Sequence, residues 1–155
     1  IKWPNDVVVR GKKVAGILTE MSTDLDRIEF VVIGIGINVN TDSFPEEIRE
    51  VATSLAIEQG KETARTPIIA AVWKQFARYE KLFEEKGSFT ALKERYEALL
   101  ANRGREVRVL DPDGEYCGVA EGITESGELL VRREDQSLTA VRSGEVSVRG
   151  IYGYI

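Results

Sequence analysis

The chain has 155 residues, of which 43% are hydrophobic, and a formal net charge of −5 with no histidine. This length can bury a core in one or two small domains. The acidic excess is spread along the chain, −2 up to Ala101 and −3 from Asn102 onward, so we expect no nonspecific binding to nucleic acid. The lack of histidine excludes Ser-His-Asp and Cys-His nucleophile systems and the ordinary zinc sites.

The single cysteine, Cys117, excludes a disulfide within the chain and fits a reducing cytoplasm. No apolar run reaches the roughly 18 residues that a membrane span needs, and no signal peptide is visible. The chain opens on Ile1 inside a motif, and its only methionine is Met21. We therefore expect a fragment of a longer protein.

Three apolar segments near the N-terminus predict neighbouring strands. Residues 7–9 are all valine, bounded by Pro4 and Gly11, while residues 14–21 and 28–37 are largely apolar. Such strands would bring a lysine, two asparagines and a glycine-rich backbone close together. This arrangement predicts a pocket for a small anionic ligand.

Helical signals follow. Residues 44–47 predict the start of a short helix, residues 54–60 a short connection, and Thr66-Pro67 the start of a long helix. Gly87-Ser88 would end that helix and cap another, lined by Phe89 and apolar residues up to Leu100. We expect core packing for the apolar stripe of the long helix, which consists of Ile68, Ile69, Val72, Trp73, Phe76, Tyr79 and Phe83.

From Asn102 the pattern changes to the alternation of strands. A turn at residues 111–114 and short apolar segments at 107–109, 116–123, 129–132, 138–141 and 146–148 predict a small antiparallel barrel or sandwich. We place a domain boundary near residues 101–105. The predicted domains are residues 1–101 and 102–155.

Three motifs stand in the N-terminal part: Lys2-Trp3-Pro4-Asn5-Asp6, residues 13–18 (KVAGIL) and residues 34–38 (GIGIN). In this order and spacing they resemble those of the biotin protein ligases. The resemblance implies an α+β fold, in which residues 1–101 form part of a mixed sheet with packed helices, as in the second half of the catalytic domain. Residues 102–155 resemble the small SH3-like β-barrel that follows it.

The family resemblance implies ATP-dependent activation of biotin to biotinyl-5′-AMP, followed by transfer to a lysine of a biotin carboxyl carrier protein domain. It also implies ATP and Mg²⁺ as cofactors, a cytoplasmic enzyme and room for a homodimer, with no role at a membrane or, for this fragment, on nucleic acid. The Gly/Arg-rich loop of the family lies upstream of Lys2. We therefore expect the fragment alone to be inactive.

By motif position, the resemblance makes Lys13 the catalytic ammonium, which also contacts biotin, and leaves Lys12 a solvated neighbour. A fixed ammonium near the carboxylate and the triphosphate would offset their repulsion and stabilise charge that develops on the α-phosphate. Gly16, Gly34 and Gly36 would bind biotin, since a backbone without side chains allows close approach. Close strand packing or a bulge is the alternative reading of Gly34 and Gly36.

The resemblance assigns five residues to ATP: Lys2, Asn5, Asn38, Glu145 and Arg149. Lys2 suits a phosphate, the amide of Asn38 suits an adenine edge, and the last two match barrel positions that reach toward the nucleotide in the family. Asp6 is a candidate Mg²⁺ ligand, and a local Asx turn after Pro4 is an equal alternative.

Two other functions remain open. A lipoate ligase or octanoyltransferase shares the ancestry of the catalytic domain, although the C-terminal barrel argues against it. A non-catalytic interaction fragment would pair an exposed sheet edge with another chain.

Overall fold

The computed structural model describes residues 1–24, 27–112, 114–143 and 147–150. The chain forms two compact units, one made of Ile1–Pro4 with Ala64–Ile155 and the other of Asn5–Thr63. These units are defined by contacts between residues, whereas the predicted domains, 1–101 and 102–155, were defined from the sequence. The predicted domain limits therefore stay a prediction. The α+β fold class is confirmed by the two sheets and three helices of the described chain.

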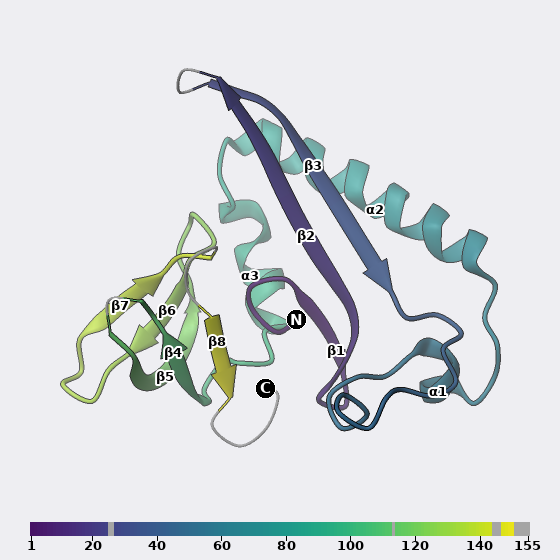
Figure 1. Cartoon of the computed structure of the whole chain (residues 1–155). Helices are drawn as coiled ribbons and strands as arrows, with labels where there is room; N and C mark the ends of the chain where they lie inside the picture. The colour runs from purple at the N-terminus through teal and green to yellow at the C-terminus, as the bar shows by residue number, and fades with distance from the viewer. Residues whose placement is uncertain (25–26, 113, 144–146, 151–155) are drawn as a thin grey trace. The chain divides into compact units, whose positions relative to one another are not determined.

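The unit Asn5–Thr63 is built on a three-stranded antiparallel sheet in the order β1-β2-β3 (Figure 1). Its strands are β1 (Asp6–Val9), β2 (Lys12–Asp24) and β3 (Arg27–Ile37). Arg10 and Gly11 join β1 to β2 with φ of 48° and 80°, as a two-residue hairpin of type I′ requires. The three predicted strands are confirmed.

The segment after β3 differs from the prediction. Residues 46–51 form hydrogen-bonded turns instead of a helix, in which Ala52 N donates to Ile48 O at 2.8 Å. The short helix is α1 (Leu55–Gln59), where only a connection was expected. Capping residues at both ends stabilise this short helix. The Ser54 hydroxyl accepts a hydrogen bond from Ile57 N, and Gly60 ends the helix in the left-handed conformation (φ 69°).

The other unit begins with two helices, α2 (Arg65–Lys86) and α3 (Thr90–Ala98). Helix α2 starts at Arg65, two residues before Pro67, the predicted first helical residue, and Ala64 caps it without a side-chain hydrogen bond. Pro67 is tolerated in the first turn because its missing N–H would have no helical partner there. Gly87 ends the helix as predicted, in the left-handed conformation.

The prediction that the stripe of α2 packs in a core is wrong for the described chain. Trp73 is 66% exposed, and Ile69, Phe76 and Phe83 are exposed as well. Edge-to-face packing of Trp73 on Phe76 covers only part of these rings. An amphipathic pattern predicts which face is apolar and cannot by itself say what covers that face.

The C-terminal strands are β4 (Glu106–Leu110), β5 (Tyr116–Ile123), β6 (Leu129–Arg132), β7 (Leu138–Val141) and β8 (Ser147–Gly150). They pair antiparallel in the order β7-β6-β5-β4-β8 (Figure 1). Gly114 N donates to Asp111 O at 3.0 Å, which confirms the predicted turn between β4 and β5. The core of this sheet consists of Val107, Val109, Ala120, Ile123, Leu129, Val131, Val141 and Val148.

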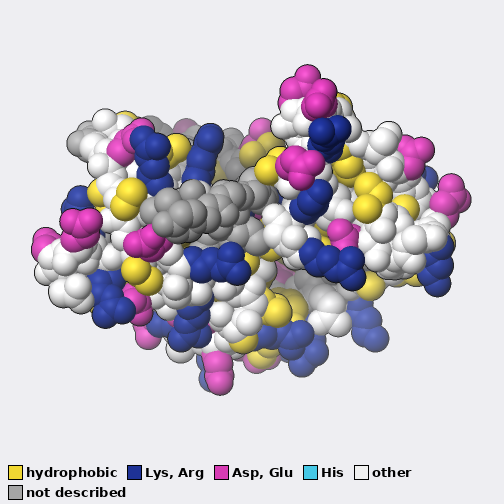
Figure 2. Space-filling model, turned by 90° about the horizontal axis from the view of Figure 1, so that it is seen from below, with side chains coloured by type: hydrophobic (Ala, Val, Ile, Leu, Met, Phe, Trp, Pro, Cys, Tyr) yellow, Lys and Arg dark blue, Asp and Glu magenta, His cyan; other side chains and the backbone are white. Residues whose placement is uncertain are grey.

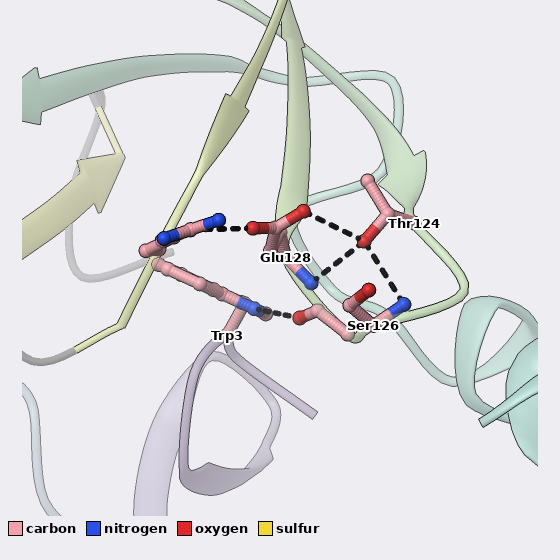
Figure 3. A network of polar contacts seen from close by, with 6 residues as sticks. Trp3, Thr124, Ser126 and Glu128 are labelled. Atoms are coloured by element: carbon pink, nitrogen blue, oxygen red, sulfur yellow. Dashed lines mark hydrogen bonds and ion pairs between the residues drawn. The ribbon is translucent and has the colours of Figure 1, made fainter. Parts of the chain in front are cut away.

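Trp3 belongs to this same core. Its indole N–H donates to Gly127 O at 3.0 Å, and its backbone N–H donates to Asn102 Oδ1 at 2.9 Å. Beside it, Glu128 accepts hydrogen bonds from Arg142 and Thr124, which lower the pKa of that carboxyl (Figure 3). The first motif therefore contributes its tryptophan to the core of the C-terminal strands.

Acidic and basic side chains are interspersed over the face seen in Figure 2. Of the helices in the described residues, none combines the length and the apolar character needed to cross a membrane.

The hydrogen bond between Trp3 and Asn102 gives a test of this anchoring. Asn102 is fully buried, so Asn102→Ala leaves the Trp3 N–H without an acceptor and should cost about 1–3 kcal/mol of unfolding free energy. Urea unfolding followed by tryptophan fluorescence measures this, in a Trp73→Phe background that leaves Trp3 as the only reporter. The exposed Arg105→Ala is the control and should stay within about 0.5 kcal/mol. An equal loss in both variants would contradict the anchoring role.

Candidate active site

One cavity in the unit Asn5–Thr63 gathers most of the predicted site residues. Its volume is about 710 Å³, within the usual range of small-molecule sites. The predicted residues around it are Asn5, Lys13, Gly16, Gly34, Gly36 and Asn38. Residues that are distant in sequence therefore converge on one cavity, as the sequence analysis predicted.

Glycines form the floor of the cavity because of the strand register. Gly16 of β2 lies directly opposite Gly36 of β3, and Gly34 lies opposite Leu18. A Cβ added at Gly34 or Gly36 would have only ordinary contacts, to backbone oxygens at 3.7 and 3.9 Å. Close strand packing therefore does not demand glycine at these two positions. What the pair Gly16 and Gly36 provides is bare backbone that a ligand can approach closely.

Lys13 reaches the glycine floor through a β-bulge. Val7 pairs with Ala15 and Val8 with Lys13, so Val14 is an extra residue in β2. Without it, Lys13 and Gly16 would point to opposite faces, since side chains alternate along a strand. With it, the two residues share a face, and Asp6, which lies opposite Gly16, faces the same way. The Lys13 ammonium lies 2.6 Å from Asp6 Oδ1.

The backbone of Lys13 is held by residues 51–53. Lys13 N donates to Val51 O, and Lys13 O accepts from Thr53 N, both at 2.8 Å. Thr53 is buried, and its carbonyl also accepts from the side-chain amide of Asn38 at 3.1 Å. The lysine and the asparagine are therefore fixed on one hydrogen-bonded frame.

The two asparagines of the cavity are already partly engaged. Asn5 Nδ2 donates to Ile17 O at 2.6 Å, and Ile17 N donates to Asn5 O at 2.9 Å. Asn38 N donates to Val14 O at 2.9 Å, where β3 ends beside β2. The bond to Ile17 O orients the side-chain amide of Asn5, and the bond to Thr53 O orients that of Asn38, so a polar ligand in the cavity would meet both amides in fixed orientations.

Of the five predicted nucleotide contacts, Lys2 and Arg149 are not among the described residues that line this cavity. Lys2 is buried in the unit that contains Ile1–Pro4, and Arg149 is exposed on β8, opposite Arg108. Glu145 lies outside the described residues. Their roles toward ATP stay predictions.

Sequence reasoning missed the other residues that line the cavity, Ala15, Ile17, Leu18, Ile35 and Ile37, of which only Leu18 shares the strand face of the glycines. The alternation of isoleucine with glycine in residues 34–37 was a usable signal, because it leaves one face of the strand without side chains. Within the described residues, no group of three acidic, cysteine or histidine side chains could hold a metal ion. The carboxylate of Asp6, the candidate Mg²⁺ ligand, forms an ion pair with the Lys13 ammonium.

Family models match both ends of the chain. Residues 1–38 match the model of the "Biotin/lipoate A/B protein ligase family", and residues 104–149 match that of the "Biotin protein ligase C terminal domain". The first match contains all three N-terminal motifs. The second covers all but the last residue of the C-terminal strands.

Among curated relatives, the chain is 38% identical over 137 residues to the bifunctional ligase/repressor BirA of Bacillus subtilis, covering 87% of this chain and 42% of that protein. It is 34% identical over 132 residues to the biotin–[acetyl-CoA-carboxylase] ligase of Mycobacterium tuberculosis, covering 84% and 46%. The chain thus spans less than half the length of these relatives.

A solved structure agrees over nearly the whole chain. The biotin protein ligase from Aquifex aeolicus in complex with biotin and ATP is 38% identical with a TM-score of 0.84, and the match covers 97% of this chain and 61% of that one. The family models therefore agree with the motifs in residues 1–38 and with the C-terminal strands in residues 104–149, and the fold agrees over 97% of the chain. The chain belongs to the biotin protein ligase family.

Proposed function

We propose that this chain carries the lysine, the glycine floor and the asparagine of a site that activates biotin with ATP. The observation that supports this most directly is the convergence of Lys13, the facing glycines Gly16 and Gly36, and Asn38 on one cavity. The reaction joins the biotin carboxylate to the α-phosphate of ATP with release of pyrophosphate. A lysine amine of a biotin carboxyl carrier domain then attacks the acyl carbonyl, and AMP leaves.

In this proposal Lys13 acts between two anions. The biotin carboxylate and the triphosphate repel one another, and the ammonium offsets this repulsion and stabilises the charge that grows on the α-phosphate. The hydrogen bonds of its backbone to residues 51–53 keep the lysine in place during the reaction. Bare backbone at Gly16, Gly34 and Gly36 receives the biotin ring system, and the apolar side chain of Leu18 on the same face suits its hydrocarbon part.

The nucleotide would meet Asn38, with Asn5 nearby on the same cavity. Lys2, Glu145 and Arg149 complete the proposed set of ATP contacts. ATP brings Mg²⁺, which proteins usually bind through one or two carboxylates together with substrate phosphates. Asp6 is the proposed carboxylate. Its ion pair with Lys13 means that most ligands of the metal would come from the phosphates and water.

The carrier domain of acetyl-CoA carboxylase or a related carboxylase is the proposed protein substrate, and a homodimer is a compatible assembly. The cytoplasm remains the proposed location, on the ground that Cys117 is the only cysteine.

One observation favours the interaction fragment as a second candidate. Strand β3 exposes apolar side chains along its length, namely Ile28, Phe30, Val31, Val32, Ile33 and Ile35. An exposed apolar strand at the edge of the described sheet is a surface on which another chain can pair. Light scattering after size-exclusion chromatography tests this for the 155-residue chain. A clean monomer at high concentration counts against this candidate.

Lys13→Ala tests the adenylation role in the longest natural chain that contains these residues. Loss of one such donor typically raises the barrier by about 3–4 kcal/mol, so biotin-dependent exchange of pyrophosphate into ATP should fall about 10²–10³-fold. The fold should stay intact, because the backbone bonds of Lys13 do not involve its side chain.

Lys12→Ala is the matched control. The Lys12 ammonium donates to Arg49 O at 2.9 Å instead of reaching the glycine floor, so this variant should keep near-normal exchange. Near-normal exchange in Lys13→Ala would remove that lysine from the proposed role.

Competition between biotin and lipoate separates the two ligase readings. The match of residues 104–149 to a biotin ligase domain favours biotin. We expect biotin alone to support pyrophosphate exchange, and lipoate at the same concentration neither to support it nor to inhibit it. Exchange driven by lipoate in place of biotin would favour the lipoate ligase reading.

A further inference from the structure

The side chain of Lys13 crosses over Gly16. A Cβ built on Gly16 would lie 2.9 Å from both Cε and Nζ of Lys13, and 3.3 Å from Asp6 Oδ1. Contacts below 3.0 Å essentially never occur for a real Cβ, so one methyl group at residue 16 has to displace the lysine. The atoms in conflict are the flexible end of a side chain, so the strand itself has no need to move.

Asp6 holds the ammonium from the neighbouring strand. The side chain of Asp6 is 10% exposed and that of Lys13 is 41% exposed, with 2.6 Å between Nζ and Oδ1. The β1–β2 register places Asp6 opposite Gly16. Because Gly16 has no side chain, the end of the Lys13 side chain can lie over it, within reach of Asp6. The two residues therefore act on the same atom from two sides, Asp6 by charge and Gly16 by its missing side chain.

The rest of Lys13 has little freedom. Its N–H and C=O are bonded to residues 51–53, and the bulge at Val14 sets the face on which its side chain emerges. Only the aliphatic arm can rotate, and without a constraint it would sample several rotamers in water. Asp6 and the open space above Gly16 are the features that select one of them.

We propose that Asp6 and Gly16 are positioning residues, which set where the Lys13 ammonium stands in the cavity. The proposal rests on the adenylation function proposed above and assigns to both residues a role distinct from contact with biotin or with a metal. In this role, substitution at either residue leaves the sheet intact and moves the ammonium. The reaction rate then falls because the charge no longer stands where negative charge develops.

The test uses Gly16→Ala and Asp6→Asn in the longest natural chain that contains these residues. Each should lower kcat of biotin-dependent pyrophosphate exchange about 100-fold, the scale expected for a misplacement of about 1 Å. In Gly16→Ala the KM for ATP, and in Asp6→Asn the KM for biotin, should change much less than kcat. The kcat of the double variant should be only slightly lower than that of the less active single variant, because both residues act through one ammonium.

NMR of protein labelled in its lysine side chains gives a readout that does not depend on activity. The Lys13 ammonium and Cε signals should shift in both variants, while the Lys12 signal and the backbone amides of β2 and β3 beyond the cavity stay in place. Asp24→Asn, at the exposed far end of β2, is the control for loss of one carboxylate and should change neither the Lys13 signals nor the rate.

The outcomes separate the two proposals. Absence of biotin-dependent exchange in the wild-type protein overturns the proposed function and, with it, this role. With an active wild type, a fall in rate without a shift of the Lys13 signals overturns the positioning role, because Gly16 and Asp6 would then act on the ligand or metal directly. A shift of these signals with an unchanged rate overturns it as well. If Asp6→Asn does not fold, Gly16→Ala decides alone.

Discussion

The candidate site depends on the ion pair between Lys13 and Asp6 across Gly16. The pair joins a largely buried Asp6 carboxylate to a partly exposed Lys13 ammonium, whose charge water partly screens. Its importance is geometric. It fixes one ammonium above a stretch of bare backbone, and the bulge at Val14 is what brings the lysine to that face.

The first motif serves two structural purposes that its sequence does not separate. Trp3 packs in the core of the C-terminal strands and is bonded to Asn102 and Gly127. Two residues after Trp3 the chain enters the other compact unit, where Asn5 contacts β2 and Asp6 pairs with Lys13. A change in this motif can therefore act through the stability of one unit or through the chemistry of the other. The measurements that distinguish them are unfolding and adenylation.

Local patterns in the sequence predicted the strands well. The limits of β5, β6 and β7 match those predicted from alternation and from glycine-containing turns. In a half-buried strand, apolar residues tend to recur at every second position, which makes the strand visible in the sequence. The short helix α1 was missed because five residues are too few to show a period. Its signals were the capping Ser54 and the terminal Gly60.

The site was predictable in its members and not in its geometry. The motifs named Lys13, Gly16, Gly36 and Asn38, and the structure brings these residues to one cavity. Neither the extra residue at Val14 nor the conflict between a side chain at position 16 and the lysine arm can be read from spacing, because both depend on register between strands. The pattern of α2 predicted an apolar face correctly and its burial wrongly, because a helical pattern does not say what covers that face.

The exposure of Lys13 sets a condition on the chemistry. Two unit charges 4 Å apart interact by only about 1 kcal/mol in bulk water, and by about 4 kcal/mol at an effective dielectric constant near 20. A stabilisation of about 3–4 kcal/mol by one ammonium therefore requires that water be largely excluded around it. In the described residues the side chain of Lys13 is 41% exposed. The frame of residues 6, 13, 16 and 51–53 thus places the charge, and whatever covers the cavity during the reaction, whether substrate or further protein, has to supply the low dielectric in which that charge is effective.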